Sequence, residues 1–182
     1  KEFANLAGKK TVEVIAILSE KYSLKDKQKF FDDIMNIASN IYKKELKTVV
    51  GVEEFLKKSK HNLYIGSNSM KNRILDGLKR VGLEKYFNPN HIYSFDLVNN
   101  PKPHPDIYIK AVNDNDLIID ETIIIEDSVV GVNAGKNAKI KVIGLTAGGH
   151  WHTDRDEKEL INAGAIATAN NYNKIQEIIE SL

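Results

Sequence analysis

Up to about Leu46, the apolar residues recur at the spacing of an α-helix. The first run follows a turn at residues 8–11 and comprises Val12, Val14, Ile15 and Leu18. A second stripe, at i, i+3, i+4 and i+7, comprises Phe30, Phe31, Ile34, Ile37, Ala38 and Ile41. Thr11 stands where a helix N-cap belongs. Both stripes are typical of ordinary helix packing, so this part of the chain is predicted to be helical throughout.

From residue 48 onward, short apolar strands alternate with helices. Strands are expected at residues 62–66, 91–95, 122–125, 140–145 and 166–169. Helices are expected at residues 52–60, 70–81, 106–112, 129–137 and 172–182. The strands are continuously apolar, which is typical of a parallel sheet covered on both faces. The pattern therefore predicts an α/β fold with three layers.

Composition narrows the class of protein without defining it. A chain of 182 residues with 42% hydrophobic residues can form one domain, or a compact core with a small appendage. Its 26 basic and 25 acidic residues leave a formal charge of +1, which favours neither nucleic acid nor a membrane as partner. The chain contains no cysteine, which excludes disulfides and thiolate metal sites. These features fit a cytoplasmic protein.

Polar side chains interrupt the pattern where the predicted strands end. Ser67 follows the first strand, Lys102 lies in the segment after the second, and Glu126 and Asp127 follow the third. Right-handed crossovers place the carboxyl ends of parallel strands at one edge, where ligands bind. A hydroxyl, an ammonium and two carboxylates can bind a phosphate together with a hard cation such as magnesium.

Each of these residues also has a simpler interpretation. Ser69 can serve as a helix cap, and a lysine between prolines is usually solvated. The acidic pair can stabilise the N-terminus of the helix that begins near Val129. The common position of all these residues at strand ends favours the functional interpretation.

Three segments resemble motifs of the haloacid dehalogenase-like (HAD) superfamily. They are Tyr64-Ile65-Gly66-Ser67-Asn68-Ser69, Pro101-Lys102-Pro103-His104-Pro105-Asp106, and residues 125–135, which begin Ile125-Glu126-Asp127-Ser128. They are similar to the second, third and fourth motifs of the branch that contains beta-phosphoglucomutase, phosphoglycolate phosphatase and sugar-phosphate phosphatases. The resemblance implies a Rossmann-like core at residues 48–182 and a partial small helical cap at residues 1–47.

The resemblance also implies a role for each site residue. Ser67 would donate a hydrogen bond to the transferring phosphoryl group, with Asn68 assisting in substrate binding, and Lys102 would bridge the nucleophile and the phosphoryl oxygens. Asp127 would bind Mg²⁺ directly, and Glu126 would ligate it or orient it through water. Lys10, and with less support Lys9, would contact the distal polar group of the substrate.

Two departures from the family pattern stand out. Lys139 occupies a position near a helix end where the family usually has glycine. The first motif, with its nucleophilic aspartate, is missing: Asp32 and Asp33 lie in a helical stripe, and Asp114 and Asp116 lie in a polar loop. We therefore expect a strand ahead of the given sequence to carry the nucleophile and to lie between the strands that end at Ser67 and Asp127. Without it, the chain is expected to be inactive.

The resulting hypothesis is a Mg²⁺-dependent phosphatase of a small phosphorylated metabolite, a sugar or sugar-acid phosphate, acting through an aspartyl-phosphate intermediate. A phosphomutase and an inactive phosphate-binding relative remain alternatives. A response-regulator receiver domain is disfavoured because its lysine follows the last strand of its set, whereas Lys102 precedes the Glu126 strand. His150, Trp151 and His152 are interpreted as loop packing. The sequence reveals neither the substrate nor the oligomeric state.

Overall fold

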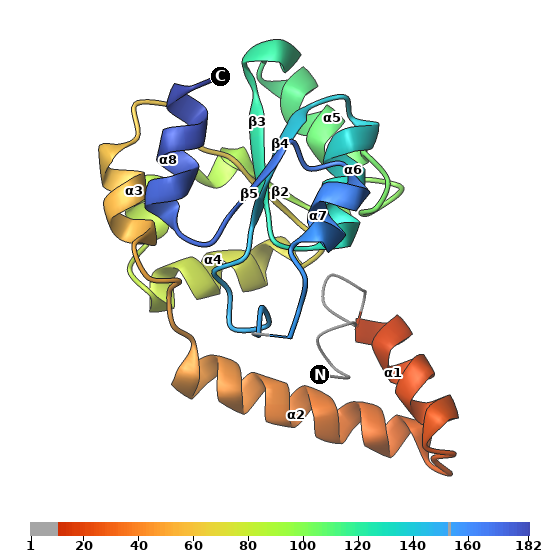
Figure 1. The fold of residues 1–182 in the computed structure, drawn as a ribbon. Coiled ribbons are helices and arrows are strands. Elements are labelled where there is room, and N and C mark those ends of the chain that lie inside the picture. The colour runs from red at the N-terminus through yellow and green to blue at the C-terminus, as the bar shows by residue number, and fades with distance from the viewer. Residues whose placement is uncertain (1–10, 153) are drawn as a thin grey trace.

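A helical pair precedes the α/β unit. The computed structural model describes residues 11–152 and 154–182, and it begins with α1 (Thr11–Lys21) and α2 (Lys27–Glu45). The two helices pack against each other and lie beneath the rest of the molecule in Figure 1. Tyr42 on α2 donates a hydrogen bond from its hydroxyl to the main-chain oxygen of Arg73, at 2.7 Å, which ties the pair to the α/β unit.

The α/β unit alternates strands and helices, as the sequence predicts. Its strands are β1 (Ile65–Ser67), β2 (Ile92–Ser94), β3 (Ile123–Glu126), β4 (Lys141–Leu145) and β5 (Ala167–Ala169). Its α-helices are α3 (Val52–Lys58), α4 (Lys71–Arg80), α5 (Asp106–Asp114), α6 (Val129–Asn137), α7 (Lys158–Ala163) and α8 (Tyr172–Glu180). The α/β class is therefore confirmed. Helix α7 falls in a segment for which the sequence pattern gave no element.

All strand pairings are parallel, and they form two sheets. β1 pairs with β2, and β3, β4 and β5 form the second sheet in that order. In Figure 1, α3 and α8 lie on one side of the strands, and α5, α6 and α7 lie on the other. The three-layer arrangement thus brings the carboxyl ends of β1 and β3 to the same edge of the fold. Within the described ranges, no backbone pairing joins the two sheets.

The isoleucine run of β3 explains how one strand serves both layers. Successive side chains of a strand point to opposite faces. Ile124 belongs to the buried cluster around Val132 of α6, whereas Ile123 and Ile125 pack against the cluster around Ile175 of α8. A strand buried on both faces needs no polar position, which is why the run is continuously apolar.

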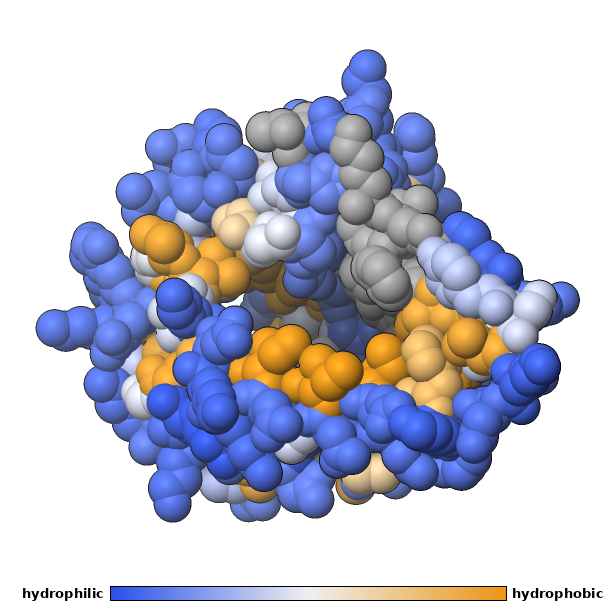
Figure 2. Space-filling model, turned by 90° about the horizontal axis from the view of Figure 1, so that it is seen from below, coloured by the Kyte–Doolittle hydropathy of each residue, from blue (hydrophilic) through white to orange (hydrophobic). Residues whose placement is uncertain are grey.

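The helical pair leaves part of its apolar surface uncovered. Seen from below, apolar side chains gather around a hollow in the surface (Figure 2). The large apolar side chains exposed on α1 and α2 are Val12, Ile17, Ile37 and Ile41. Among the helices that the structure describes, none has the length and apolar character needed to cross a bilayer.

Lys139 has left-handed backbone geometry just beyond the end of α6. Its φ is +61°, and the main-chain N–H of Ile140 bonds back to Gly135 O at 3.1 Å. This arrangement ends helices readily when the left-handed residue is glycine, because a Cβ atom makes that conformation costly. Lys139 therefore differs from the family pattern in residue type, but the left-handed turn at the end of α6 is retained.

Lys139→Gly is expected to raise the free energy of unfolding by about 0.5–1 kcal/mol. Relief of the left-handed strain, about 1–2 kcal/mol, outweighs the extra freedom that glycine gives the unfolded chain. Urea denaturation would measure the change. Lys136→Gly, the same replacement inside α6, should instead lose about 1 kcal/mol. Equal losses in both variants would contradict the explanation.

Candidate active site

Ser67 ends β1 in a turn that leaves its hydroxyl at the strand terminus. The residue pairs with Ser94 of β2, and its Oγ accepts a hydrogen bond from Ser69 N at 3.1 Å. The N-cap of α4 is Met70, so Ser69 does not cap the helix. A Cβ atom on the preceding Gly66 would lie 2.9 Å from the Tyr108 ring, and glycine therefore allows α5 to approach this strand end closely.

Asn68 fixes the main chain of Lys102. Its Nδ2 donates to Lys102 O and its Oδ1 accepts from Lys102 N, each at 3.0 Å. The amide thus satisfies both main-chain polar groups of one loop residue. Lys102 then extends its ammonium back over β1, where Nζ donates to Gly66 O at 2.9 Å.

The side chain of Glu126, at the end of β3, forms a buried ion pair with Lys102. Lys102 Nζ and Glu126 Oε1 form an ion pair, and the two side chains are 8% and 9% exposed. Tyr108 OH donates to the same oxygen at 2.6 Å, whereas Oε2 accepts from Asp127 N at 3.2 Å and from Ser128 Oγ at 3.3 Å. Both carboxylate oxygens are therefore engaged. A buried charge pair persists when its remaining lone pairs are satisfied in this way.

Tyr108 contacts both members of the Lys102–Glu126 pair. Burial, together with the negative charge of Glu126, raises the pKa of its phenol well above the ordinary value. The hydroxyl therefore remains protonated and acts as a donor. Lys102 Nζ also lies 4.8 Å from the centroid of the Tyr108 ring, within the range of a cation–π contact.

Asp127, by contrast, presents an accessible carboxylate. Its side chain is 53% exposed, and Oδ2 lies 3.7 Å from His150 Nε2. Loss of hydration raises the pKa of this carboxyl, and the charge of Glu126 adds to the effect, whereas His150 and Lys102 oppose it. In the folded protein, ionised Asp127 is thus less favourable than an ordinary surface aspartate.

Asp127→Asn is expected to stabilise the metal-free protein at neutral pH. Because the pKa of Asp127 is raised, the folded state binds the proton more tightly than the unfolded state does, and stability falls as pH rises from the ordinary value of 3.8 through the folded value. The advantage of asparagine should appear over that window and then level off. Thermal unfolding in EDTA at a series of pH values would measure it. An asparagine variant less stable than wild type at pH 7 would contradict the argument.

The donor set at this edge is compatible with magnesium. Mg²⁺ prefers oxygen ligands and is commonly bound through one or two carboxylates together with waters and a substrate phosphate. Asp127 supplies an accessible carboxylate of this kind, and the oxygens of Glu126 are already bonded. Within residues 11–152 and 154–182, no group of three or more histidine, aspartate and glutamate side chains is arranged to hold a metal.

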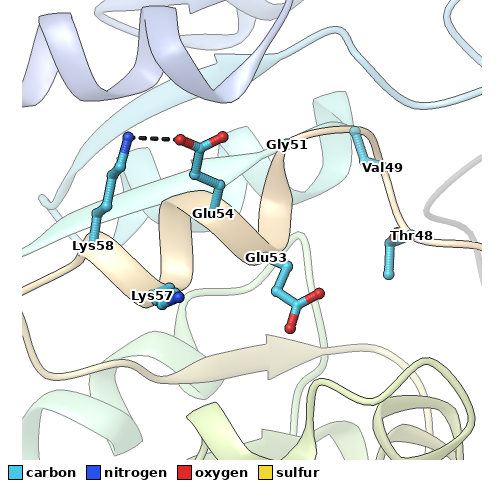
Figure 3. A pocket seen from close by; sticks show the side chains of 7 residues that line it. All are labelled: Thr48, Val49, Gly51, Glu53, Glu54, Lys57 and Lys58. Atoms are coloured by element: carbon cyan, nitrogen blue, oxygen red, sulfur yellow. Dashed lines mark hydrogen bonds and ion pairs between the residues drawn. The ribbon is translucent and has the colours of Figure 1, made fainter.

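A separate cavity of about 780 Å³ opens beside α3 (Figure 3). Its lining residues are Thr48, Val49, Gly51, Glu53, Glu54, Lys57 and Lys58. Glu54 pairs with Lys58, and Glu53 pairs with Lys85. Both of its carboxylates are therefore already paired, and none of the predicted site residues lines the cavity.

The structure brings together the predicted residues that it describes. Ser67, Asn68, Lys102, Glu126 and Asp127 all lie at the adjoining ends of β1 and β3, where the Lys102 ammonium spans the two. Lys10 and Lys9 lie outside the described residues. Sequence reasoning did not single out Tyr108, although it lies on the helix that follows the Lys102 segment. His150 and Trp151, which are interpreted from the sequence as loop packing, also contact the main-chain oxygen of Asp127.

Comparison with known proteins identifies the class. A family model described as haloacid dehalogenase-like hydrolase matches residues 1–145. The chain therefore belongs to the haloacid dehalogenase-like hydrolase family, and the resemblance drawn from its motifs is confirmed.

Individual relatives agree with this assignment. A phosphorylated carbohydrates phosphatase from Thermotoga maritima is 31% identical over 176 residues, which cover 93% of this chain and 76% of that protein. A conserved haloacid dehalogenase-like protein of unknown function from Agrobacterium tumefaciens has a similar structure, with a TM-score of 0.87, 26% identity, and coverage of 98% of this chain and 81% of the other. A structure assigned as a beta-phosphoglucomutase from Thermotoga maritima has a TM-score of 0.77 and 28% identity over 97% of this chain and 81% of the other. A pyrophosphatase from Listeria welshimeri matches this chain over only 39% of its own length.

Proposed function

We propose that the complete protein is a Mg²⁺-dependent phosphatase of a small phosphorylated metabolite. The observation that carries the proposal is the convergence of a strand-end hydroxyl, a buried ammonium and an accessible carboxylate at one edge of a parallel fold. Such a set can bind a phosphoryl group, because the hydroxyl donates to one oxygen and the cation attracts the others. Membership of the haloacid dehalogenase-like hydrolase family supports a hydrolytic outcome.

The side chains divide between phosphate binding and support. Ser67 would donate to a phosphoryl oxygen, and Lys102 would stabilise the charge that develops on the transferring group. Asn68 would act by holding the main chain of Lys102, because both its polar side-chain atoms are bonded there. Glu126 would serve as the buried counter-ion of Lys102, with Asp127 as the direct metal ligand.

Bound magnesium would neutralise phosphate charge as a Lewis acid. In the proposed reaction, an aspartate carboxylate attacks phosphorus and the bond to the ester oxygen breaks, while a second aspartate gives that oxygen its proton. Water then gives a proton to the second aspartate and attacks the acyl phosphate, whose bond to the carboxylate breaks. Inorganic phosphate leaves, and both aspartates return to their starting protonation states. Both aspartates are proposed to lie on a strand between β1 and β3, in a segment ahead of the given sequence. Among residues 11–152 and 154–182, β1 and β3 belong to separate sheets, which is compatible with this position.

A phosphorylated carbohydrate is the substrate class that the relatives favour. The Thermotoga maritima phosphatase, which matches most of this chain, bears that specificity in its name. The structural relative assigned as a beta-phosphoglucomutase supports the second candidate, a phosphomutase that returns the phosphoryl group to the sugar. We further propose that residues 1–47 form part of a cap over the site, in which Lys10 contacts the substrate.

A screen of phosphorylated metabolites with the full-length protein tests the proposal. Wild type should release inorganic phosphate from sugar phosphates when Mg²⁺ is present and lose this activity in EDTA. Asp127→Asn should reduce turnover by orders of magnitude with the fold retained, as circular dichroism would verify. Isomerised sugar phosphate without free phosphate would favour the mutase. Near-normal phosphate release by the Asp127 variant would refute the assignment.

A further inference from the structure

The loop between β4 and α7 reaches the end of β3 with two ring nitrogens near one atom. Trp151 Nε1 donates to the main-chain oxygen of Asp127 at 2.9 Å, and His150 Nε2 lies 3.1 Å from the same oxygen. Trp151 is the single tryptophan of the sequence. Its indole therefore contacts the residue whose carboxylate is the best placed for a metal.

That oxygen lies just beyond the strand pairing. The register of β3 with β4 ends at Glu126 opposite Gly144, so the next carbonyl has no partner in the ladder. An indole N–H is a suitable partner for this carbonyl because it can only donate. The bond also fixes the peptide plane that follows Asp127, and with it the direction in which the side chain leaves the backbone.

The Trp151 indole is in turn held in place by contacts with Arg155 and with the buried core. The guanidinium carbon of Arg155 lies 4.0 Å from the centroid of the Trp151 ring. Arg155 is only 7% exposed, and its Nε and Nη2 donate to Glu159 Oε2 of α7 at 3.1 and 2.9 Å. Trp151 also packs against the buried cluster that contains Leu160. A chain of contacts thus runs from α7 through the ring to Asp127.

We propose that Trp151 is a positioning residue for the metal-binding carboxylate of Asp127. It acts through the main chain and touches neither metal nor substrate, while Arg155 and Glu159 keep its N–H directed at the carbonyl. The inference rests on the proposed function, because it assumes that Asp127 binds the metal. Groups that orient a metal ligand typically change metal affinity by 10–100-fold when they are removed.

Trp151→Phe in the full-length protein separates this role from packing. Phenylalanine keeps an aromatic ring under Arg155 but has no N–H. Titration calorimetry should show Mg²⁺ affinity weakened about tenfold, and the Mg²⁺ concentration needed for half-maximal activity should rise by a similar factor. Turnover at saturating Mg²⁺ should stay within threefold of wild type, because the reacting groups remain in place.

Leu160→Ala provides the matched control. Leu160 lies in the same buried cluster and is 0% exposed, so the variant should unfold at a lower temperature while its Mg²⁺ affinity stays at the wild-type value. The proposal is overturned if Trp151→Phe binds Mg²⁺ as tightly as wild type, or if Leu160→Ala weakens binding equally. A wild-type protein that neither binds Mg²⁺ nor needs it for activity would refute the proposed function, and this inference with it.

Discussion

Lys102→Met is expected to lower the free energy of unfolding by about 3–5 kcal/mol in metal-free protein. The replacement keeps a long apolar side chain but removes the ammonium, which leaves the Glu126 carboxylate buried with no cation beside it. Breaking a buried ion pair from one side costs this much because the remaining charge is uncompensated. Both side chains are less than a tenth exposed, so water cannot take the place of the lost partner. Urea denaturation in EDTA would measure the loss.

Two further variants show whether the cost comes from the pair. Adding Glu126→Gln to Lys102→Met removes the stranded charge and should recover at least half of the lost stability, which a double-mutant cycle would report as strong coupling. Lys58→Met breaks the exposed pair with Glu54, where the side chains are 72% and 66% exposed, and should cost far less stability because water replaces the lost partner. Additive losses for Lys102 and Glu126 would show that the two residues are not an energetic unit.

The site could be predicted from the sequence because its residues lie at or after the carboxyl ends of strands. Residues such as Ser67 and Asp127 are far apart in sequence, yet parallel strands with right-handed crossovers bring their carboxyl ends to one edge. Hydrophobic pattern alone places those strands, because a doubly covered strand such as β3 contains no polar residue until it ends. The position of a polar residue along the chain thus determines its position in the fold.

Contacts made by side chains across elements could not be predicted in this way. The sequence predicts a helix at residues 106–112, but it does not reveal that the Tyr108 hydroxyl reaches Glu126. The family resemblance implies that Asn68 assists in substrate binding, but it does not reveal that both polar atoms of this side chain bond to the main chain of Lys102. Trp151 lies in an irregular loop, whose path depends on tertiary packing that no periodic pattern encodes.

Helix α7 was missed for a related reason. Its six residues, Lys158–Ala163, include only one fully buried large side chain, Leu160, so no stripe of helical spacing can be recognised. Such a short helix is stabilised by tertiary packing rather than by its own sequence. Its importance lies in Glu159, which holds Arg155 against the ring of Trp151.

Gly131→Ala is expected to destabilise the protein by about 2–6 kcal/mol and to reduce turnover at least a hundredfold. A Cβ atom at this position would lie 2.0 Å from both Cδ and Oε2 of Glu126, so the carboxylate must leave its place. Overpacking costs about 1–3 kcal/mol, and the polar groups that Glu126 abandons cost about 1–3 kcal/mol more. Because Lys102 loses its counter-ion at the same time, the ammonium that we propose to bind phosphate is no longer held in position.

Two other glycines separate this effect from glycine replacement in general. Gly149→Ala, where a Cβ atom meets nothing within 4 Å, should change stability by less than about 0.5 kcal/mol. Gly135 lies on the same helix as Gly131, and its replacement by alanine crowds Val142 of β4. Gly135→Ala should therefore cost stability, yet the turnover of the folded fraction should persist because Glu126 is not displaced. Steady-state assays below the unfolding temperature of each variant would compare them. If Gly131→Ala and Gly135→Ala lost turnover equally, the glycine of this motif would serve packing alone, and the buried carboxylate would have no part in placing the ammonium.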